Sequence, residues 1–207
     1  MEILPFPFPS KGLEEDNVIE INKDEYKGIC VYADVDHNVI HPVTYELIDI
    51  TLDIRNRLYP DAKVSVLSNA TRIGREDVRE ALMKVDNPIL KIDSPLAEMA
   101  NAIDNPAAGY SLDNTIANLK LFNGNFILQT MFLKGWDRSG KYYIDCCEPN
   151  HCRAWRELVR ELHPREGMMY TLDRETPQKG LEKVGVDQME QIAAPLMKEG
   201  FKVQIRG

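Results

Sequence analysis

The chain has 207 residues, of which 43% are hydrophobic and 28% are charged, and this is enough to bury one core in a single domain. Its formal net charge of -8 argues against nucleic acid or an anionic membrane as the main partner, because both bind basic surfaces. No apolar run approaches the roughly 20 residues of a membrane span, and the N-terminus lacks the pattern of a signal peptide. We therefore expect a cytoplasmic protein.

The first 28 residues differ from the rest of the chain. Their early prolines block a helix and interrupt a sheet ladder, so we expect residues 1–28 to form an extended arm and lead-in. From residue 29 to residue 207, short apolar runs alternate with helical patterns. We expect strands at residues 27–34, 62–71, 87–94, 126–133, 167–173 and 201–207, and helices at residues 43–58 and 75–83, after Ser111, around Trp155 and after Asp187. This alternation predicts an α/β fold with parallel strands and right-handed crossovers, either an open doubly wound sheet or a partial barrel.

The segments between these elements carry weaker patterns. Residues 95–110 contain several turn formers and are expected to be irregular. Residues 136–151 are long enough for a lid or a binding loop. Asp187 and Glu190 have the spacing of a capping box at the start of the last helix.

Four of the expected strands end on polar side chains. Because ligands bind at the carboxyl ends of parallel strands, these side chains are expected to share one pocket. The residues are Ser68 and Asn69, Lys91 and Asp93, Gln129 and Thr130, and Tyr170 and Asp173.

The segments VSVLSNAT, ILKIDSP, FNGNFILQTMFLKG and MMYTLDRETP follow one another in this order. Their succession, with LEKV and GFKVQ after it, resembles the later strands and helices of radical S-adenosylmethionine proteins, in particular the bacterial group called iron-sulfur oxidoreductases. The resemblance covers residues 29–207. It implies a partial (β/α)6 TIM-like barrel, incomplete at the N-terminal side, with a 4Fe-4S cluster and S-adenosylmethionine at the carboxyl ends of the strands. It also implies reductive cleavage of S-adenosylmethionine to a 5′-deoxyadenosyl radical.

The resemblance assigns roles to the strand-end residues. Ser68 and Asn69 would hydrogen bond the ribose or the carboxylate of the cofactor, and Lys91 and Asp93 resemble a polar pair near the ribose. The adenine and the substrate would be lined by Gln129, Thr130 and Tyr170. The alternative is that Ser68, Asn69 and Thr130 satisfy backbone groups at the ends of strands.

The cluster motif of that family is absent from this sequence. The family uses three cysteines in a C-x3-C-x2-C loop, and the four cysteines here do not have that spacing. In place of the family's G-x-GEP segment, residues 34–39 read DVDHNV, with His41 and Pro42 still in register. Two interpretations follow: the sequence lacks its true N-terminal part, or the protein is a degenerate relative that has lost the radical chemistry.

A group of soft ligands lies in one short segment. Cys146, Cys147, His151 and Cys152 could hold zinc or one edge of an auxiliary iron-sulfur cluster. Adjacent cysteines are awkward ligands for one tetrahedral ion, so the alternative is a loop with free thiols. Cys30 lies inside a strand and is expected in the core.

Residues 32–38, YADVDHN, support a different enzyme class. A strand followed by Asp34 and Asp36 resembles the first motif of haloacid dehalogenase-like phosphatases, in which the first aspartate attacks phosphorus and the second acts as acid and base. Residues 67–69 would then bind the phosphoryl oxygens, and Lys91 would supply the charge.

A third interpretation is a non-catalytic pseudoenzyme that binds a nucleotide, a peptide or a partner chain. A barrel without its first strand exposes an edge at residues 27–34, and such edges are usually covered. The apolar arm with Leu4, Phe6 and Phe8 could cover this edge, or a second copy could do so in a homo-oligomer. A small molecule or a peptide is the expected substrate if the protein is an enzyme.

Overall fold

Six parallel strands form the main sheet in the part of the chain that the structure describes, residues 28–32, 43–173, 176 and 178–207 of a computed structural model, with side chains from residue 47 on. In sheet order the strands are β1 (Gly28–Tyr32), β2 (Lys63–Ser68), β3 (Asn87–Lys91), β4 (Ile127–Met131), β7 (Glu166–Tyr170) and β9 (Val203–Arg206). All five neighbouring pairs are parallel. The strands are confirmed, although most are shorter than the sequence predicts.

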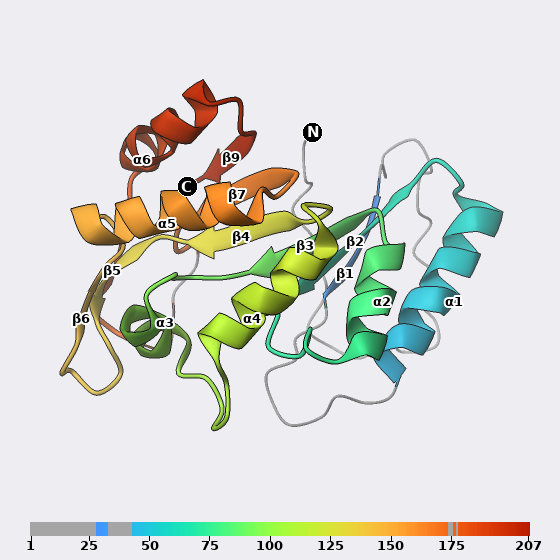
Figure 1. Ribbon diagram of the computed structural model, residues 1–207, viewed down its shortest axis with the longest axis horizontal. Helices are drawn as coiled ribbons and strands as arrows, with labels where there is room; N and C mark the ends of the chain where they lie inside the picture. The colour runs from blue at the N-terminus through green and yellow to red at the C-terminus, as the bar shows by residue number, and fades with distance from the viewer. Residues whose placement is uncertain (1–27, 33–42, 174–175, 177) are drawn as a thin grey trace, which may run out of the picture.

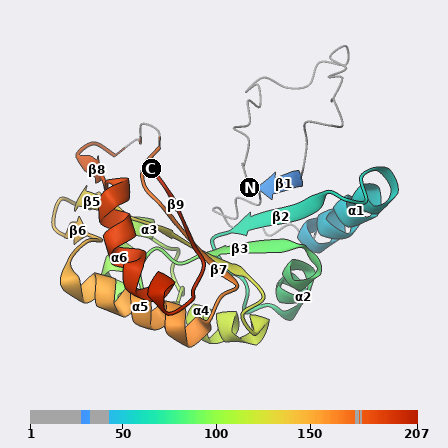
Figure 2. The same ribbon diagram turned by 90° about the horizontal axis from the view of Figure 1, so that it is seen from above.

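Most of the helices lie along one face of this curved sheet, whereas α3 (Ala97–Asp104) lies beside β6 (Tyr143–Asp145) near the ends of the strands (Figure 2). They are α1 (Val43–Leu58), α2 (Glu76–Lys84), α3 (Ala97–Asp104), α4 (Leu112–Leu119) with a 3-10 turn η1 (Lys120–Phe122), α5 (Pro149–Leu162) and α6 (Val186–Lys198). Figure 1 looks onto this layer, with α1 and α2 at the β1 and β2 end of the sheet and α5 over β4 and β7. The chain is therefore an α/β protein with the partial-barrel arrangement that the sequence predicts.

The alternation of side chains along each strand gives the sheet two different faces. Val66, Leu90 and Leu128 are buried in the main core under the helices. On the opposite face, Ile89, Ile127 and Met168 form a second, smaller apolar cluster. Because Lys91, Gln129 and Met168 are in register on β3, β4 and β7, the polar groups of this second face collect near the carboxyl ends of those strands.

Three antiparallel strands form a small second sheet beside these strand ends (Figure 1), in the order β6 (Tyr143–Asp145), β5 (Leu133–Trp136), β8 (Leu181–Lys183). The prediction of a long loop at residues 136–151 is therefore wrong. The main-chain hydrogen bonds of a hairpin organise that segment, and its last residues begin α5.

Two further local predictions are wrong. Residues 95–110 contain α3, because Met99 and Ala100 give this segment a buried side that the turn formers around it obscured. The last helix has Gly185 as its N-cap and makes no side-chain cap hydrogen bond, so Asp187 and Glu190 form no capping box. The arm expected at residues 1–28 lies outside the described residues except for Gly28.

Candidate functional site

A charged cluster occupies the carboxyl end of β3. Lys91 is the last residue of the strand, and its Nζ lies 2.5 Å from Oδ2 of Asp93 and 3.6 Å from Oδ1 of Asp104, which ends α3. The Asp93 side chain is fully buried, and the side chains of Lys91 and Asp104 are 26% and 40% exposed. Two carboxylates thus share one ammonium group at the mouth of the partial barrel.

Asp93 also completes the sheet. Its Oδ1 accepts a hydrogen bond from the backbone N–H of Met131 on β4, at 2.9 Å. Its Oδ2 accepts no aligned hydrogen bond in the structure and is held by the charge of Lys91. A buried carboxylate is expensive without such a counter-charge, so Lys91 and Asp93 are one unit.

Burial and neighbouring charges shift the pKa values of Lys91 and Asp104. Burial alone would lower the pKa of Lys91, but the charges of Asp93, Tyr170 and Asp104 outweigh it and raise the pKa. Loss of contact with bulk water and the neighbouring Asp93 carboxylate raise the pKa of Asp104, although its exposed surface lets water moderate the shift. Lys91 is therefore firmly charged, and Asp104 holds its proton more tightly than an ordinary aspartate.

Two tyrosines complete the cluster. Burial, followed by the Asp93 charge, raises the pKa of Tyr170 to about 12 at the end of β7. Burial also raises the pKa of Tyr110, which comes shortly before α4 and interacts with both carboxylates. Both phenols stay protonated at neutral pH, so each can donate a hydrogen bond.

Gln129 and Thr130 point to opposite faces of β4. Gln129 is half-buried on the same face as Lys91 and donates a hydrogen bond from Nε2 to Sδ of Met168, at 3.4 Å. Thr130 is buried under the helices, where its hydroxyl donates to the carbonyl of Ile92 at 2.8 Å and accepts from Nε1 of Trp155 at 3.1 Å. Gln129 is thus next to the charged cluster, and Thr130 anchors α5 to the sheet.

Ser68 and Asn69 shape the turn after β2. The Ser68 hydroxyl accepts from the N–H of Ala70 at 3.2 Å, and Asn69 Oδ1 accepts from the N–H and the hydroxyl of Thr71 at 3.2 and 2.9 Å. Ala70 is buried with a φ of 59°, a conformation that these three hydrogen bonds to Ser68 and Asn69 support. Both residues satisfy backbone groups, and their role in cofactor binding stays a prediction.

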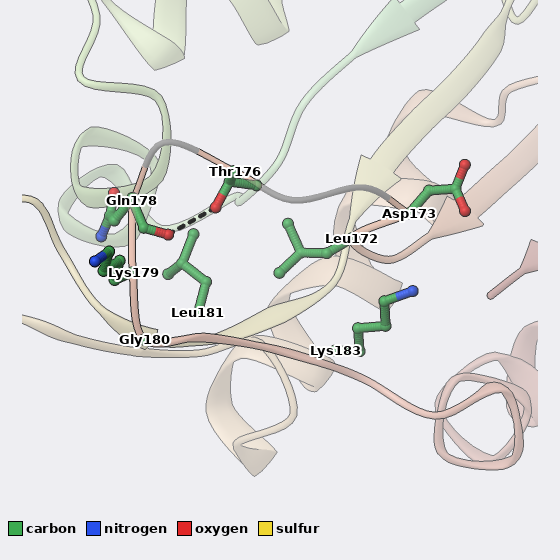
Figure 3. Close-up of a pocket in the computed structure, with 8 residues that line it drawn as sticks. All are labelled: Leu172, Asp173, Thr176, Gln178, Lys179, Gly180, Leu181 and Lys183. Atoms are coloured by element: carbon green, nitrogen blue, oxygen red, sulfur yellow. Dashed lines mark hydrogen bonds between the residues drawn. The ribbon is translucent and has the colours of Figure 1, made fainter.

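A cavity of about 620 Å³ lies between the segment after β7 and β8, and none of the residues that line it belongs to the charged cluster. Figure 3 shows Leu172 and Leu181 turned toward one another, with Asp173 and Lys183 on one side of them. Thr176 donates a hydrogen bond to the carbonyl of Gln178 at 2.7 Å and so shapes the far wall. The volume of this cavity is in the range of small-molecule pockets.

The cysteine segment lies at the start of α5. Cys146 and Cys152 are buried and Cys147 is half-buried. Burial is the main cause that raises the pKa of all three thiols, to about 12 for Cys146 and about 11 for Cys147. Nδ1 of the buried His151 donates to the carbonyl of Cys146 at 2.8 Å, and its Nε2 has no hydrogen-bond partner.

These residues do not fit a metal cluster in the arrangement that the structure gives them. Among the described residues, no three side chains of His, Cys, Asp or Glu are placed to hold a metal ion. We therefore derive no chemistry through iron or zinc at this segment. Asp34 and Asp36, the predicted phosphatase residues, lie outside the described residues, as does the side chain of Cys30.

Asp104 and Tyr110 are site residues that the sequence did not reveal. Both belong to the connection between β3 and β4, where the predicted irregular segment gave no reason to bring them to a strand end. Asn105 and Pro106 were the available signal: Asn105 adopts a φ of 43° and ends α3, which fixes Asp104 at the C-terminal end of the helix.

Comparison with known proteins shows the fold. No protein-family model matches the chain. A domain of pyruvate-formate lyase-activating enzyme from Bacteroides vulgatus superposes with a TM-score of 0.56 and 11% identity, over 87% of this chain and 99% of that structure. SuiB from Streptococcus suis, bound to S-adenosylmethionine, gives a TM-score of 0.55 and 12% identity over 79% of this chain and 36% of SuiB. The chain has the partial-barrel fold of radical S-adenosylmethionine proteins.

In two further comparisons the chain covers only about a third of the other protein. SuiB bound to its precursor peptide SuiA gives a TM-score of 0.54, over 78% of this chain and 34% of SuiB. The UPF0026 protein slr1464 of Synechocystis is 32% identical over 78 residues, which are 36% of this chain and 29% of that protein. The match thus spans less than a third of the length of this curated relative.

Among the described residues, no helix has the length and apolar character needed to cross a membrane.

Proposed function

We propose that the protein is a cytoplasmic, radical S-adenosylmethionine-like protein that binds a nucleoside or a related small molecule at the carboxyl ends of β3, β4 and β7. The observation that carries this proposal is the cluster of Lys91, Asp93, Asp104 and Tyr170 at the mouth of a partial barrel. The likeness to SuiB bound to S-adenosylmethionine supports the choice of ligand.

Each side chain has a chemical task in this proposal. Asp104 and the amide of Gln129 are hydrogen-bonding groups for hydroxyls of a ribose, and the Tyr170 hydroxyl donates a hydrogen bond. The Lys91 charge holds Asp93 and Asp104 in place. S-adenosylmethionine, when bound, would supply a nucleoside and a sulfonium group; a radical would form from it only with one electron from a donor such as a four-iron cluster.

We further propose that ligand binding in this chain does not depend on a four-iron cluster, because its cysteines do not have the C-x3-C-x2-C spacing. Under this proposal the protein is a pseudoenzyme that binds the ligand without catalysing a reaction. A catalytic radical enzyme is the alternative.

The test is anaerobic reconstitution with iron and sulfide, followed by iron counting and by calorimetric titration with S-adenosylmethionine and S-adenosylhomocysteine, before and after reconstitution. We expect binding in both states and no retained iron. Retention of about four irons per chain would favour the catalytic alternative. Absence of binding in both states would contradict the proposed pocket.

Substitutions inside and outside the proposed pocket distinguish specific ligand binding from non-specific binding. Gln129→Leu keeps the size of a half-buried side chain and removes its amide, and we expect at least a tenfold loss of affinity. Lys84→Met is the matched control, because the Lys84 ion pair with Asp49 lies on the exposed surface of α1 and α2. Equal affinities of the two variants would contradict the placement of the ligand.

A further inference from the structure

The charged cluster at the end of β3 leaves one carboxyl group with a weak counter-charge. Among the described residues, the charges that act most strongly on Asp104 are those of Asp93 and Lys91. The Lys91 ammonium lies 2.5 Å from Asp93 but 3.6 Å from Asp104, so Asp93 takes the larger share of its charge. Because the Asp104 side chain is also 40% exposed, it is the acidic group of the cluster that a ligand can reach.

The buried Asp93 side chain next to it lacks a hydrogen-bond donor on one oxygen. Its Oδ2 accepts no aligned hydrogen bond from the described residues, although the Lys91 charge is close. Two ionised carboxylates cannot hydrogen bond to one another, whereas a protonated Asp104 can donate to Asp93. After burial and the Asp93 charge, this hydrogen bond is a further cause that raises the pKa of Asp104. Without a ligand, a proton on Asp104 therefore takes the place that a cation would occupy.

The end of helix α3 adds to the negative potential at this point. Asp104 is the last residue of α3, and the last turn of this described helix contains no basic residue. The free carbonyl groups at the C-terminus of a helix carry partial negative charge, which disfavours a carboxylate there and favours a cation. The helix end and the Asp93 carboxylate thus act on Asp104 in the same direction.

The remaining titratable groups near the cluster do not supply the missing positive charge. Four of them stay neutral between about pH 6.5 and about pH 8.5, because burial opposes their charged forms: Tyr110, Tyr170, Cys146 and His151. On β6, the strand that α3 contacts, Asp145 pairs with Lys134 at 3.4 Å. In this pH range the protonation of Asp104 is therefore the event that changes the charge of the cluster.

We propose that Asp104 selects nucleosides that carry a positively charged centre beside the ribose, and that this centre replaces the Asp104 proton. The inference rests on the proposed function, since it concerns the same ligand site. On binding, the O–H bond of Asp104 breaks, the proton leaves to the solvent, and the carboxylate remains beside the cation without any transfer of electrons. A neutral nucleoside leaves the proton where it is. The favoured ligand class is therefore a nucleoside with a sulfonium or ammonium group.

Two nucleosides that differ by one methyl group and one charge test this proposal: 5′-methylthioadenosine and its S-methylsulfonium derivative. Neither contains an amine or a carboxylate of its own that titrates near neutral pH. Isothermal titration calorimetry of the full chain, in buffers of different ionisation enthalpy, measures both the affinity and the number of protons released.

The two ligands should respond differently to pH. The affinity for the sulfonium should rise with pH, by up to about tenfold per pH unit while Asp104 is protonated, with release of about one proton per ligand. The affinity for 5′-methylthioadenosine should stay constant, without proton release. Near the upper end of the pH range, the sulfonium should bind at least about tenfold more tightly than the neutral nucleoside.

Substitution of Asp104 tests whether this residue is responsible. Asp104→Asn keeps the size of the side chain and removes its titration, so it should bind both nucleosides with similar affinity at every pH. Glu98→Gln is the matched control, because Glu98 is an exposed carboxylate in the first turn of the same helix. This control should keep the preference and the proton release of the wild-type protein.

Each failure has a separate meaning. Equal affinities of the wild-type protein for the two nucleosides, or binding of the sulfonium without proton release, would overturn this inference and leave the nucleoside pocket standing. Absence of binding by both nucleosides would contradict the proposed function as well. A preference that survives in Asp104→Asn, or that Glu98→Gln loses to the same extent, would show that Asp104 is not the selecting group.

Discussion

At the scale of single residues, the ion pair of Lys91 and Asp93 gives the clearest prediction. Lys91→Met leaves the fully buried Asp93 carboxylate without its counter-charge. Removing one partner of a buried pair is strongly destabilising, so we expect the free energy of unfolding to fall by about 3 kcal/mol. Urea denaturation followed by circular dichroism measures this change.

The ion pair of Lys84 and Asp49 is the control for that measurement. Its side chains are 47% and 51% exposed, and exposed pairs contribute roughly 0 to 1 kcal/mol. Lys84→Met should therefore change the free energy of unfolding by less than about 1 kcal/mol. Similar losses in both variants would show that Asp93 does not depend on Lys91.

His151 gives a prediction about pH. Burial lowers the pKa of this histidine below the ordinary histidine value of about 6.5 in the folded protein. Below that pH the unfolded chain takes up a proton that the folded chain does not, so stability is complete above about pH 6.5 and falls on acidification. One such proton contributes a slope of about 1 kcal/mol per pH unit. In the His151→Gln variant, the free energy of unfolding should no longer show this dependence on pH below about pH 6.5.

The exposed His163 provides the comparison. It caps the end of α5 with a φ of 44°, which asparagine also tolerates. His163→Asn should keep the pH slope of the wild-type protein. If His163→Asn loses the slope and His151→Gln retains it, the assignment to the buried ring is wrong.

At the scale of helices and strands, Gly135 links the two parts of the small sheet. It has a φ of 133°, and a Cβ there would clash with the carbonyl oxygen of Gly180 and approach Leu181 on β8. Gly135→Ala should therefore destabilise the protein by more than 2 kcal/mol, because backbone atoms must move apart. Thermal denaturation and amide signals of β8 would report the change.

Gly140, at the tip of the hairpin, is the control for Gly135, because substitution there tests the cost of a positive φ without a steric clash. It also has a positive φ, 68°, but a Cβ would meet nothing within 4 Å. Gly140→Ala should cost only the conformational strain of about 1 kcal/mol. Equal losses at the two positions would mean that β5 and β8 do not approach as closely as the structure indicates.

The elements that the sequence predicted well are those with a strong local pattern. The strands β2, β3, β4 and β7 contain short apolar segments, and α5 has a clear apolar row around Trp155. In contrast, α3 is short, with three alanines among its eight residues, and β5 and β6 have only four and three residues. Asp104 reaches the site only through the path of α3. Local sequence therefore predicted Lys91, Asp93 and Tyr170 at strand ends but could not supply their partners.

At the scale of the whole molecule, the two faces of the sheet should respond differently to the loss of side-chain volume. Leu128 and Ile127 are neighbours on β4 with opposite orientations, one in the large core and one in the small cluster. Leu128→Ala should lower the free energy of unfolding by about 4 kcal/mol, because surrounding helices cannot close the cavity. Ile127→Ala should lower it by about 2 kcal/mol, since the smaller cluster can adjust. Urea denaturation of both variants measures the difference, and a larger loss for Ile127→Ala would contradict it.

The strands at whose ends the pocket is proposed, β3, β4 and β7, are the third, fourth and fifth of the six in the main sheet. Sheets open first at their edge strands, because those have a neighbour on one side only. The backbone amides of the three central strands will consequently exchange with solvent more slowly than those of β1 and β9. The backbone beneath the pocket opens only when the protein unfolds as a whole. Slow exchange of these amides would mean that the proposed pocket has a rigid backbone floor, whatever its side chains do.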